Sequence, residues 1–297
     1  MLFPLFSCTL LNHNTLPLTD SSQATSTTKP LNLHFAALGK GRTLLFLHGF
    51  GANSYTWSKV SPTLSQNYRL ILIDLKGHGA SPKPNDRAYS LHDQAELVSA
   101  FITDNGLEDV TLIGHSLGGG IALLVALRLA SKVPNAISSL ILIDSIAYSQ
   151  PLPSFIKILR IPILAQLSVW LVPNRLQTLQ VLKLAYYDSD KITDETINAY
   201  SAPLSLPGAH RALIETAKQI IPQDIEEIGL RYGTIRVPTL LLWGKHDRIV
   251  PLEIAERLHR SIRNSDLVVI DEVGHVPQEE APAATLQAIQ KFLQARP

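Results

Sequence analysis

The 297-residue sequence predicts an α/β fold, in which helices cover both faces of a doubly wound, mostly parallel sheet. Short, uninterrupted runs of Leu, Ile and Val are typical of parallel strands that are buried on both faces. These runs alternate along the chain with amphipathic stretches of helical length, which is the pattern of repeated strand–helix–strand units. A chain of this length also buries enough apolar surface to hold a core without disulfides or metals.

Strands are expected where short apolar runs are bounded by turn residues. They are expected at Leu31–Leu38, Thr43–Leu47, Arg69–Ile73, Val110–Ile113, Leu140–Ile143, Thr239–Trp243 and Leu267–Ile270. Helices are expected between them, where apolar residues recur at steps of three and four. They are expected at Trp57–Gln66, His92–Asp104, Leu117–Ala130, Leu252–Ser261 and Ala283–Gln294.

One connection is much longer than the others. Between Asp144 and Val237 lie 92 residues, whereas a helical crossover requires only about a dozen. The surplus predicts a helical cap, residues 149–221, over the carboxyl ends of the strands, where open α/β sheets carry their sites. Its helices are expected at Leu152–Leu171, Leu176–Tyr187, Asp194–Ala202 and His210–Ile220. Residues 31–148 and 222–297 then form the core.

Composition and charge exclude several classes of protein. Lys and Arg number 26 against 25 Asp and Glu, and no block of one sign occurs, which disfavours nucleic-acid binding through a basic face. The single cysteine, Cys8, excludes an internal disulfide framework and cysteine-based metal sites. The sequence has no G-x-G-x-x-G, Walker or H-E-x-x-H motif, so neither a cofactor nor a metal is expected.

Residues 1–30 are predicted to be a flexible leader. Met1–Leu11 is apolar, but no Lys or Arg precedes Lys29, so the basic region of a secretory signal is missing. The segment that follows is rich in Ser, Thr and Asn, as linkers are. We therefore expect a cytoplasmic protein. Leu5–Cys8 resembles a bacterial lipobox, so the alternative is an envelope lipoprotein anchored through Cys8, if the true start lies upstream.

A nucleophile elbow is predicted at Gly114–Gly118, which matches G-x-S-x-G. An apolar strand precedes it and a helix-prone stretch follows, as the motif requires. The two glycines allow a turn too tight for side chains two residues before and after the serine, so that the Ser116 hydroxyl stands clear of the sheet. A serine hydroxyl is a poor nucleophile at neutral pH and requires a base that a carboxylate orients.

The base and the acid are expected after later strands, because the chain order in this kind of site is Ser, acid, His. His275 follows the last predicted strand on a loop that contains Gly274, and is the candidate base. Asp247 follows the strand ending at Trp243 and is the favoured acid. Asp144 also ends a strand at the same edge and remains the alternative. Its other expected role is structural: its carboxylate would accept backbone hydrogen bonds where the chain enters the inserted helices.

An oxyanion hole needs two backbone amides that point at the developing negative charge. Leu117 begins the helix after the elbow, and its amide is the first candidate. His48–Gly51 directly follows a central strand, so the Phe50 amide is the second candidate. Asp74–Ser81, after the next strand, is interpreted as a structural turn that braces the site.

From about residue 31 to the C-terminus the chain resembles the α/β-hydrolase superfamily, through the elbow, His48–Gly51, Asp74–Ser81, Asp247 and His275. The resemblance implies Ser116 as nucleophile, His275 as base, Asp247 as acid, the Phe50 and Leu117 amides as oxyanion hole, and a cap inserted after the sixth strand. Within the superfamily, the chain is similar to capped bacterial esterases and lipases, and meta-cleavage-product (C–C bond) hydrolases resemble it as near relatives.

Two departures narrow the resemblance. Ser116 stands where epoxide hydrolases and haloalkane dehalogenases carry aspartate, which disfavours those activities. Val276 follows the histidine where C–C hydrolases often have tryptophan. The expected function is therefore hydrolysis of small-molecule carboxylic esters with short to medium acyl groups. C–C or thioester hydrolysis on the same triad is the alternative, and a ligand-binding, receptor-like protein is the alternative of another class. No obligatory membrane partner is expected.

The first predicted cap helix carries apolar residues at three- and four-residue steps, which define one apolar face. These residues are Phe155, Ile158, Ile161, Leu164, Leu167 and Leu171. Most are expected to pack on the other cap helices, and a few to line an apolar acyl pocket.

Overall fold

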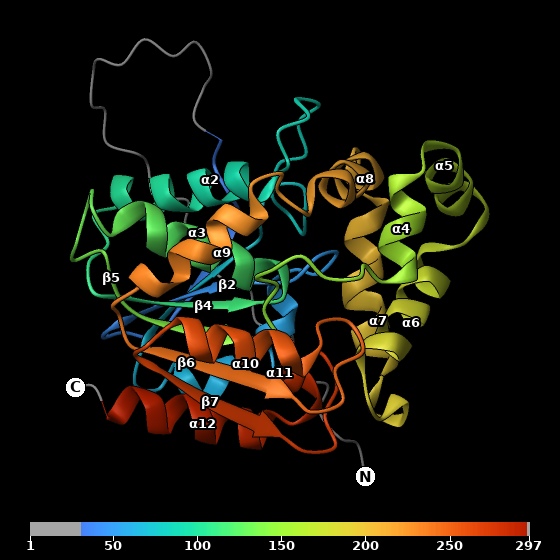
Figure 1. The fold of residues 1–297 in the computed structure, drawn as a ribbon. Coiled ribbons are helices and arrows are strands. Elements are labelled where there is room, and N and C mark those ends of the chain that lie inside the picture. The colour runs from blue at the N-terminus through green and yellow to red at the C-terminus, as the bar shows by residue number, and fades with distance from the viewer. Residues whose placement is uncertain (1–30, 296–297) are drawn as a thin grey trace.

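The computed structural model describes residues 31–295, and its centre is a seven-stranded sheet (Figure 1). The strands are β1 (Phe35–Leu38), β2 (Thr43–Leu47), β3 (Arg69–Ile73), β4 (Val110–His115), β5 (Ile137–Ile143), β6 (Thr239–Gly244) and β7 (Ser265–Ile270). Their order is β1-β3-β2-β4-β5-β6-β7, and β1 alone of these pairs antiparallel. The predicted mostly parallel sheet is confirmed. The predicted leader, with Cys8, lies outside the described residues.

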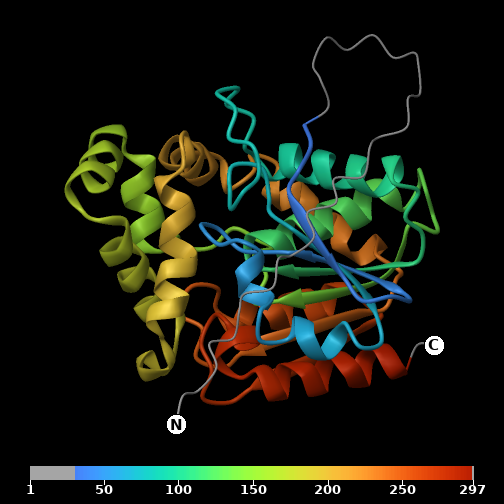
Figure 2. The ribbon, with the colours of Figure 1, turned by 180° about the vertical axis from the view of Figure 1, so that it is seen from behind.

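Helices lie on both faces of this sheet. They are α1 (Ser61–Leu64), α2 (Leu91–Asp104), α3 (Leu117–Leu129), α9 (Ile225–Arg231), α10 (Leu252–Ser261), α11 (Pro277–Glu280) and α12 (Pro282–Gln294). Figures 1 and 2 show α2, α3 and α9 on one side of the sheet and α12 on the other. The helix expected at Trp57–Gln66 is wrong as one element. It is divided into a 3₁₀ helix, Ser54–Trp57, and α1, in which Pro62 fits only the first turn because it has no amide hydrogen to donate.

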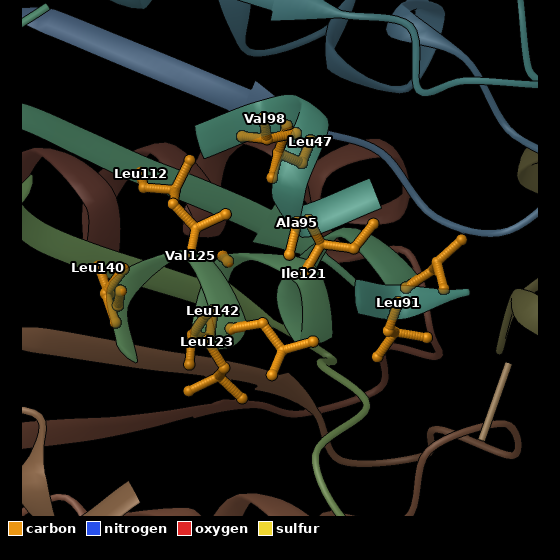
Figure 3. Packing of buried hydrophobic residues seen from close by; sticks show 14 of the residues in the cluster. Leu47, Leu91, Ala95, Val98, Leu112, Ile121, Leu123, Val125, Leu140 and Leu142 are labelled. Carbon is orange, nitrogen blue, oxygen red and sulfur yellow. The ribbon is translucent and has the colours of Figure 1, made fainter. Parts of the chain in front are cut away.

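The core follows from the alternation of side chains along the strands. In β2, Leu45 and Leu47 join the apolar cluster beneath α2 and α3, whereas Leu44 and Phe46 join the cluster on the other face with α12. Figure 3 shows the first cluster, where side chains of α2 and α3 meet those of β2, β4 and β5. Because both faces are covered, the strands read as unbroken apolar runs.

The long connection between β5 and β6 forms a group of helices beyond the carboxyl ends of the parallel strands (Figures 1 and 2). We call this group the cap, and it comprises α4 (Ser154–Arg160), α5 (Pro162–Leu171), α6 (Asn174–Ala185), α7 (Asp194–Ser201) and α8 (Ala209–Gln219). Five described strands precede it, whereas the resemblance implied six.

The helix expected at Leu152–Leu171 is wrong as a single element, because the chain breaks at Ile161. Pro162 has no amide hydrogen for a helical bond and disfavours helical geometry in the residue before it. Ile161 is accordingly extended, with φ −95° and ψ 111°. Phe155 is half-buried, but the other residues of the expected apolar face are exposed. The prediction that most of them pack on other cap helices is therefore wrong. Within residues 31–295 no helix is both long and apolar enough to cross a membrane.

Candidate active site

Ser116 lies at the sharp turn between β4 and α3. Its φ is 53°, a backbone conformation that non-glycine residues seldom adopt. A Cβ on Gly114 would lie 2.4 Å from the Gly118 carbonyl oxygen, and one on Gly118 would lie 2.2 Å from that of Leu47. The glycine spacing in the motif is thus a steric requirement of the turn. Ser116 is held by its amide, which donates to the Ile143 carbonyl at 2.9 Å.

Ser116, His275 and Asp247 form one hydrogen-bonded chain across the edge of the sheet. The Ser116 Oγ lies 2.9 Å from His275 Nε2, and His275 Nδ1 lies 2.7 Å from Asp247 Oδ2. A carboxylate can only accept, so Nδ1 carries the proton and Nε2 is free to accept from the serine. The side chains of His275 and Asp247 are 6% and 0% exposed, which keeps water from competing for these bonds.

Asp247 is held as an ionised acceptor. Burial alone raises the pKa of a carboxyl, but His275 and nearby backbone amides counter it and lower the Asp247 pKa below its ordinary value. The other oxygen, Oδ1, accepts from the Ile249 and Val250 amides at 2.7 and 3.0 Å. These two bonds set the orientation of the carboxylate toward His275.

Asp144, the alternative acid, lies beside this hydrogen-bonded chain, and within residues 31–295 it is not hydrogen-bonded to His275. Its Oδ1 accepts from the Gly244 amide at 3.0 Å, and its side chain is also hydrogen-bonded to Asp247. Burial and the charge of Asp247 raise the Asp144 pKa well above its usual range. Of the two candidate acids, Asp247 is the one that is hydrogen-bonded to His275 in the structure.

This raised pKa predicts how the substitution Asp144→Asn changes stability with pH. Below about pH 3.9, the ordinary aspartate pKa, the carboxyl is protonated in both the folded and the unfolded chain. As the pH rises, the unfolded state loses this proton first, so Asp144 lowers the free energy of unfolding. Asparagine has no such proton. We expect the variant to gain stability relative to the parent from pH 4 to 7, as measured by urea unfolding. A difference that shrinks with rising pH contradicts a raised pKa.

The two expected oxyanion-hole residues lie near Ser116 in the chain or in space. Leu117 is the first residue of α3, and first-turn amides of a helix have no partner within the helix. Phe50 belongs to the loop after β2, where a Cβ on Gly49 would lie 3.2 Å from the Ser116 Cβ. The loop therefore comes as close to the serine as a glycine permits.

The loop that carries Phe50 is braced by the segment after β3. His48 Nδ1 donates to the Gly49 carbonyl at 2.8 Å, and its Nε2 accepts from the Leu75 amide at 3.0 Å. Burial lowers the His48 pKa, which favours the neutral ring that this pairing requires. Asp74 accepts from the Ser54 amide at 2.8 Å. The structural role expected for Asp74–Ser81 matches these contacts.

Sequence reasoning missed a role for His115, the residue directly before Ser116 in the elbow. Its Nε2 donates to the His275 carbonyl at 2.7 Å, so it fixes the backbone of the candidate base. Burial, together with the neighbouring His275, lowers the His115 pKa to about 3, which keeps this ring neutral. The signal was available, because a polar residue within a buried elbow needs a partner.

Sequence reasoning also missed Glu280, which joins the cap to the loop that carries His275. Its carboxylate accepts from the Gly274 amide at 2.8 Å, and from the Tyr187 and Asp188 amides of the cap at 3.2 and 2.7 Å. The His275 amide itself donates to the Ala185 carbonyl at 2.6 Å. Hydrogen bonds to the cap therefore help to hold the loop that carries the candidate base.

Asp144, Asp247 and His275 are also the described residues whose ligand atoms lie close enough to hold a metal, all within 4.8 Å of one another. Both ring nitrogens of His275, however, are engaged by Asp247 and Ser116. A metal would have to displace one of these bonds. The arrangement is suited to moving a proton between serine and histidine.

Comparison with known proteins places this geometry in a family. Residues 44–288 match the model of the Alpha/beta hydrolase family. The uncharacterized hydrolase YugF of Bacillus subtilis is 30% identical over 262 residues, which cover 88% of this chain and 92% of that protein. A 2-hydroxy-6-oxononadienedioate/2-hydroxy-6-oxononatrienedioate hydrolase of Pseudomonas putida is 28% identical over 274 residues, covering 89% and 92%.

A solved structure agrees with these relatives. That of a thermophilic esterase from Thermogutta terrifontis aligns with a TM-score of 0.74 and 26% identity, over 91% of this chain and 97% of that one. The chain belongs to the alpha/beta hydrolase family, as the sequence motifs indicated, and it is a hydrolase.

Proposed function

We propose that this hydrolase cleaves carboxylic esters with short to medium acyl groups through Ser116, His275 and Asp247. The observation that carries the proposal is the continuous hydrogen-bond chain from Ser116 Oγ through both nitrogens of His275 to Asp247. This is the arrangement in which a serine is activated by a neutral imidazole whose tautomer a buried carboxylate fixes.

In the proposed reaction, His275 Nε2 takes the Ser116 proton as Oγ attacks the ester carbonyl. The negative oxygen of the tetrahedral intermediate accepts hydrogen bonds from the Phe50 and Leu117 amides. His275 then returns the proton to the departing alcohol, which leaves an acyl-serine. A water molecule, deprotonated by the same nitrogen, attacks the acyl-serine, and His275 returns that proton to Ser116 Oγ as the acid leaves. Asp247 stays ionised throughout and stabilises the imidazolium.

An apolar hollow beside the elbow is the place we propose for the acyl group. It holds about 470 Å³ of empty space, a volume that includes open solvent at its mouth. Its lining is mainly apolar and comprises Leu91, Gly120, Leu124, Ile146, Ala147, Tyr148, Gln150, Leu152, Ile220, Ile221, Ile225, Ile228 and Tyr232. One lining residue, Ile146, lies next to the elbow, because its amide donates to the Ser116 carbonyl at 3.2 Å. None of the expected cap-face residues lines this hollow, and their expected part in an acyl pocket stays a prediction.

Filling this hollow is expected to shorten the preferred acyl chain. In Ile221→Trp, the larger ring occupies space that an acyl chain would use. We expect kcat/KM to fall by about fourfold for each methylene that loses its contact, measured on p-nitrophenyl esters from acetate to octanoate. The control is Leu164→Ala on the exposed side of α5, which should leave the chain-length profile unchanged. An equal loss for every ester contradicts the pocket role.

Hydrolysis of a C–C bond is the second candidate, favoured by the Pseudomonas putida relative. The substrate in that relative's name carries two carboxylates, whereas the lining of the hollow has no Lys or Arg to bind them. The deciding experiment measures kcat/KM for p-nitrophenyl butyrate and for a 2-hydroxy-6-oxo-dienedioate in parallel. We expect the ester to be the better substrate by a wide margin. The opposite order replaces ester hydrolysis with C–C hydrolysis, and binding of both without turnover contradicts an enzyme.

A further inference from the structure

The exposed apolar side chains of the described residues gather on one part of the cap. Most of the large ones lie between α4 and the start of α6: Ile158, Ile161, Ile163, Leu164, Leu167, Leu171 and Leu176. Ile163 and Leu171 are 72% and 73% exposed, although Ile and Leu are among the residues most often buried. Contiguous apolar surface of this kind marks an interaction site. We call residues 157–171 the α4–α5 tip.

Helix α5 turns its apolar face outward. Ile163, Leu164, Leu167 and Leu171 follow one another at steps of one, three and four residues, which places them on one side of a helix. All four are exposed, whereas Ala165, on the opposite side, is fully buried against the protein. A helix of a water-facing surface has the reverse arrangement. The outward face is therefore built for a partner that is itself apolar.

The charge of the same region has one sign. Between Asp144 and Asp188 the sequence contains four basic residues and no acidic residue, in a chain whose net charge is only +1. Lys157 and Arg160 lie at the tip, are exposed, and form no ion pair within residues 31–295. From Ile161 to Asn174 no residue is charged. An uncharged, apolar helix next to free cations is typical of segments that lie in the interface of an anionic bilayer.

We propose that the α4–α5 tip docks on the surface of an anionic lipid bilayer, with the apolar face of α5 inserted among the acyl chains and with Lys157 and Arg160 at the headgroups. Figures 1 and 2 show α5 at the outer corner of the cap, away from the sheet, where a flat surface can reach it. Docking of this kind is independent of the proposed ester hydrolysis.

The charge distribution favours lipid over a second copy of the chain. A two-fold interface through this face would bring Lys157 and Arg160 of one copy toward the same residues of the other. The segment from residue 145 to 187 offers no carboxylate to neutralise them. Anionic headgroups supply that neutralisation, and fluid acyl chains need no matching shape.

The test measures how the purified full chain co-sediments with vesicles of phosphatidylglycerol and phosphatidylcholine, and with vesicles of phosphatidylcholine alone. We expect binding to the anionic vesicles that weakens with added salt. The double variant Leu167→Glu with Leu171→Glu should reduce binding by about tenfold or more, because it places charges where acyl chains would lie. The double variant Lys157→Gln with Arg160→Gln should reduce it by about 25-fold, at roughly fivefold for each cation.

Leu230→Glu is the matched control, because Leu230 is 85% exposed but lies on α9, outside the tip. It should bind vesicles as the parent does. The proposal is overturned if the parent does not bind anionic vesicles, if it binds both vesicle types equally, or if Leu230→Glu loses as much as the tip variants. Light scattering adds a further decisive outcome. A parent dimer that the tip glutamates dissociate, without vesicle binding, would assign the face to a second copy.

Discussion

Replacing Asp247 by asparagine is expected to lower kcat for an activated ester by about 10⁴-fold. The side chain keeps its shape, but its amide can donate to His275 Nδ1, which favours the tautomer that presents a hydrogen instead of a lone pair to Ser116. The imidazolium of the transition state also loses the ionised partner that lies 2.7 Å away. Burial of Asp247 makes this loss large, because no water replaces the carboxylate.

The matched control is Asp144→Asn. It changes the neighbouring carboxyl, which follows β5, whereas Asp247 follows β6. The raised pKa of Asp144 predicts that it already carries a proton, so asparagine replaces one neutral side chain by another. We expect kcat to stay within a few-fold of the parent. Both variants should be assayed with p-nitrophenyl butyrate, with folding checked by circular dichroism. If kcat falls steeply in Asp144→Asn and stays near the parent value in Asp247→Asn, Asp144 is the acid that orients His275. Equal, modest losses of kcat in both variants would mean that either carboxylate can orient His275.

Ser116→Ala is expected to remove turnover almost completely, by about 10⁴- to 10⁶-fold in kcat. Alanine lacks the oxygen that forms the acyl intermediate, and no second hydroxyl is bonded to His275 in the described structure. The direct measurement is labelling by a fluorophosphonate, followed by mass spectrometry. The parent should take up one label per chain at Ser116, and the alanine variant none.

Fluorophosphonate labelling that persists in Ser116→Ala would contradict the assignment of Ser116 as the nucleophile. Ser145 provides a useful comparison, because it is also fully buried near the elbow, yet its hydroxyl donates to the Ile146 carbonyl at 3.0 Å and has no contact with His275. Ser145→Ala should therefore keep the parent's labelling.

The elbow was predictable from sequence because its geometry is local. A turn with φ 53° at Ser116 needs glycine two residues on either side, and those glycines are visible in the sequence. The parallel strands were predictable for a similar reason, since burial on both faces leaves an apolar run. The choice between Asp247 and Asp144 was not local. Both follow neighbouring strands, and contacts made in the folded chain separate them: Asp247 is oriented by the Ile249 and Val250 amides, whereas Asp144 accepts from the Gly244 amide.

Helices were expected in the long connection between β5 and β6, but their packing was not predicted correctly. A three- and four-residue period shows which residues share a face, but it does not show whether another helix covers that face. Ile158 to Leu171 therefore suggested an interior surface, whereas the structure leaves these side chains exposed. The division of the first cap helix followed from one residue, Pro162, whose effect depends on how the chain is folded around it.

The bonds from the cap to the loop of His275 limit how the two parts can be exchanged between relatives. A donor cap joined at its ends alone would leave the His275 amide without the Ala185 carbonyl, and Glu280 without the Tyr187 and Asp188 amides. Chimeras that change specificity should therefore transplant residues 185–188 together with the segment 274–280, as a single cassette.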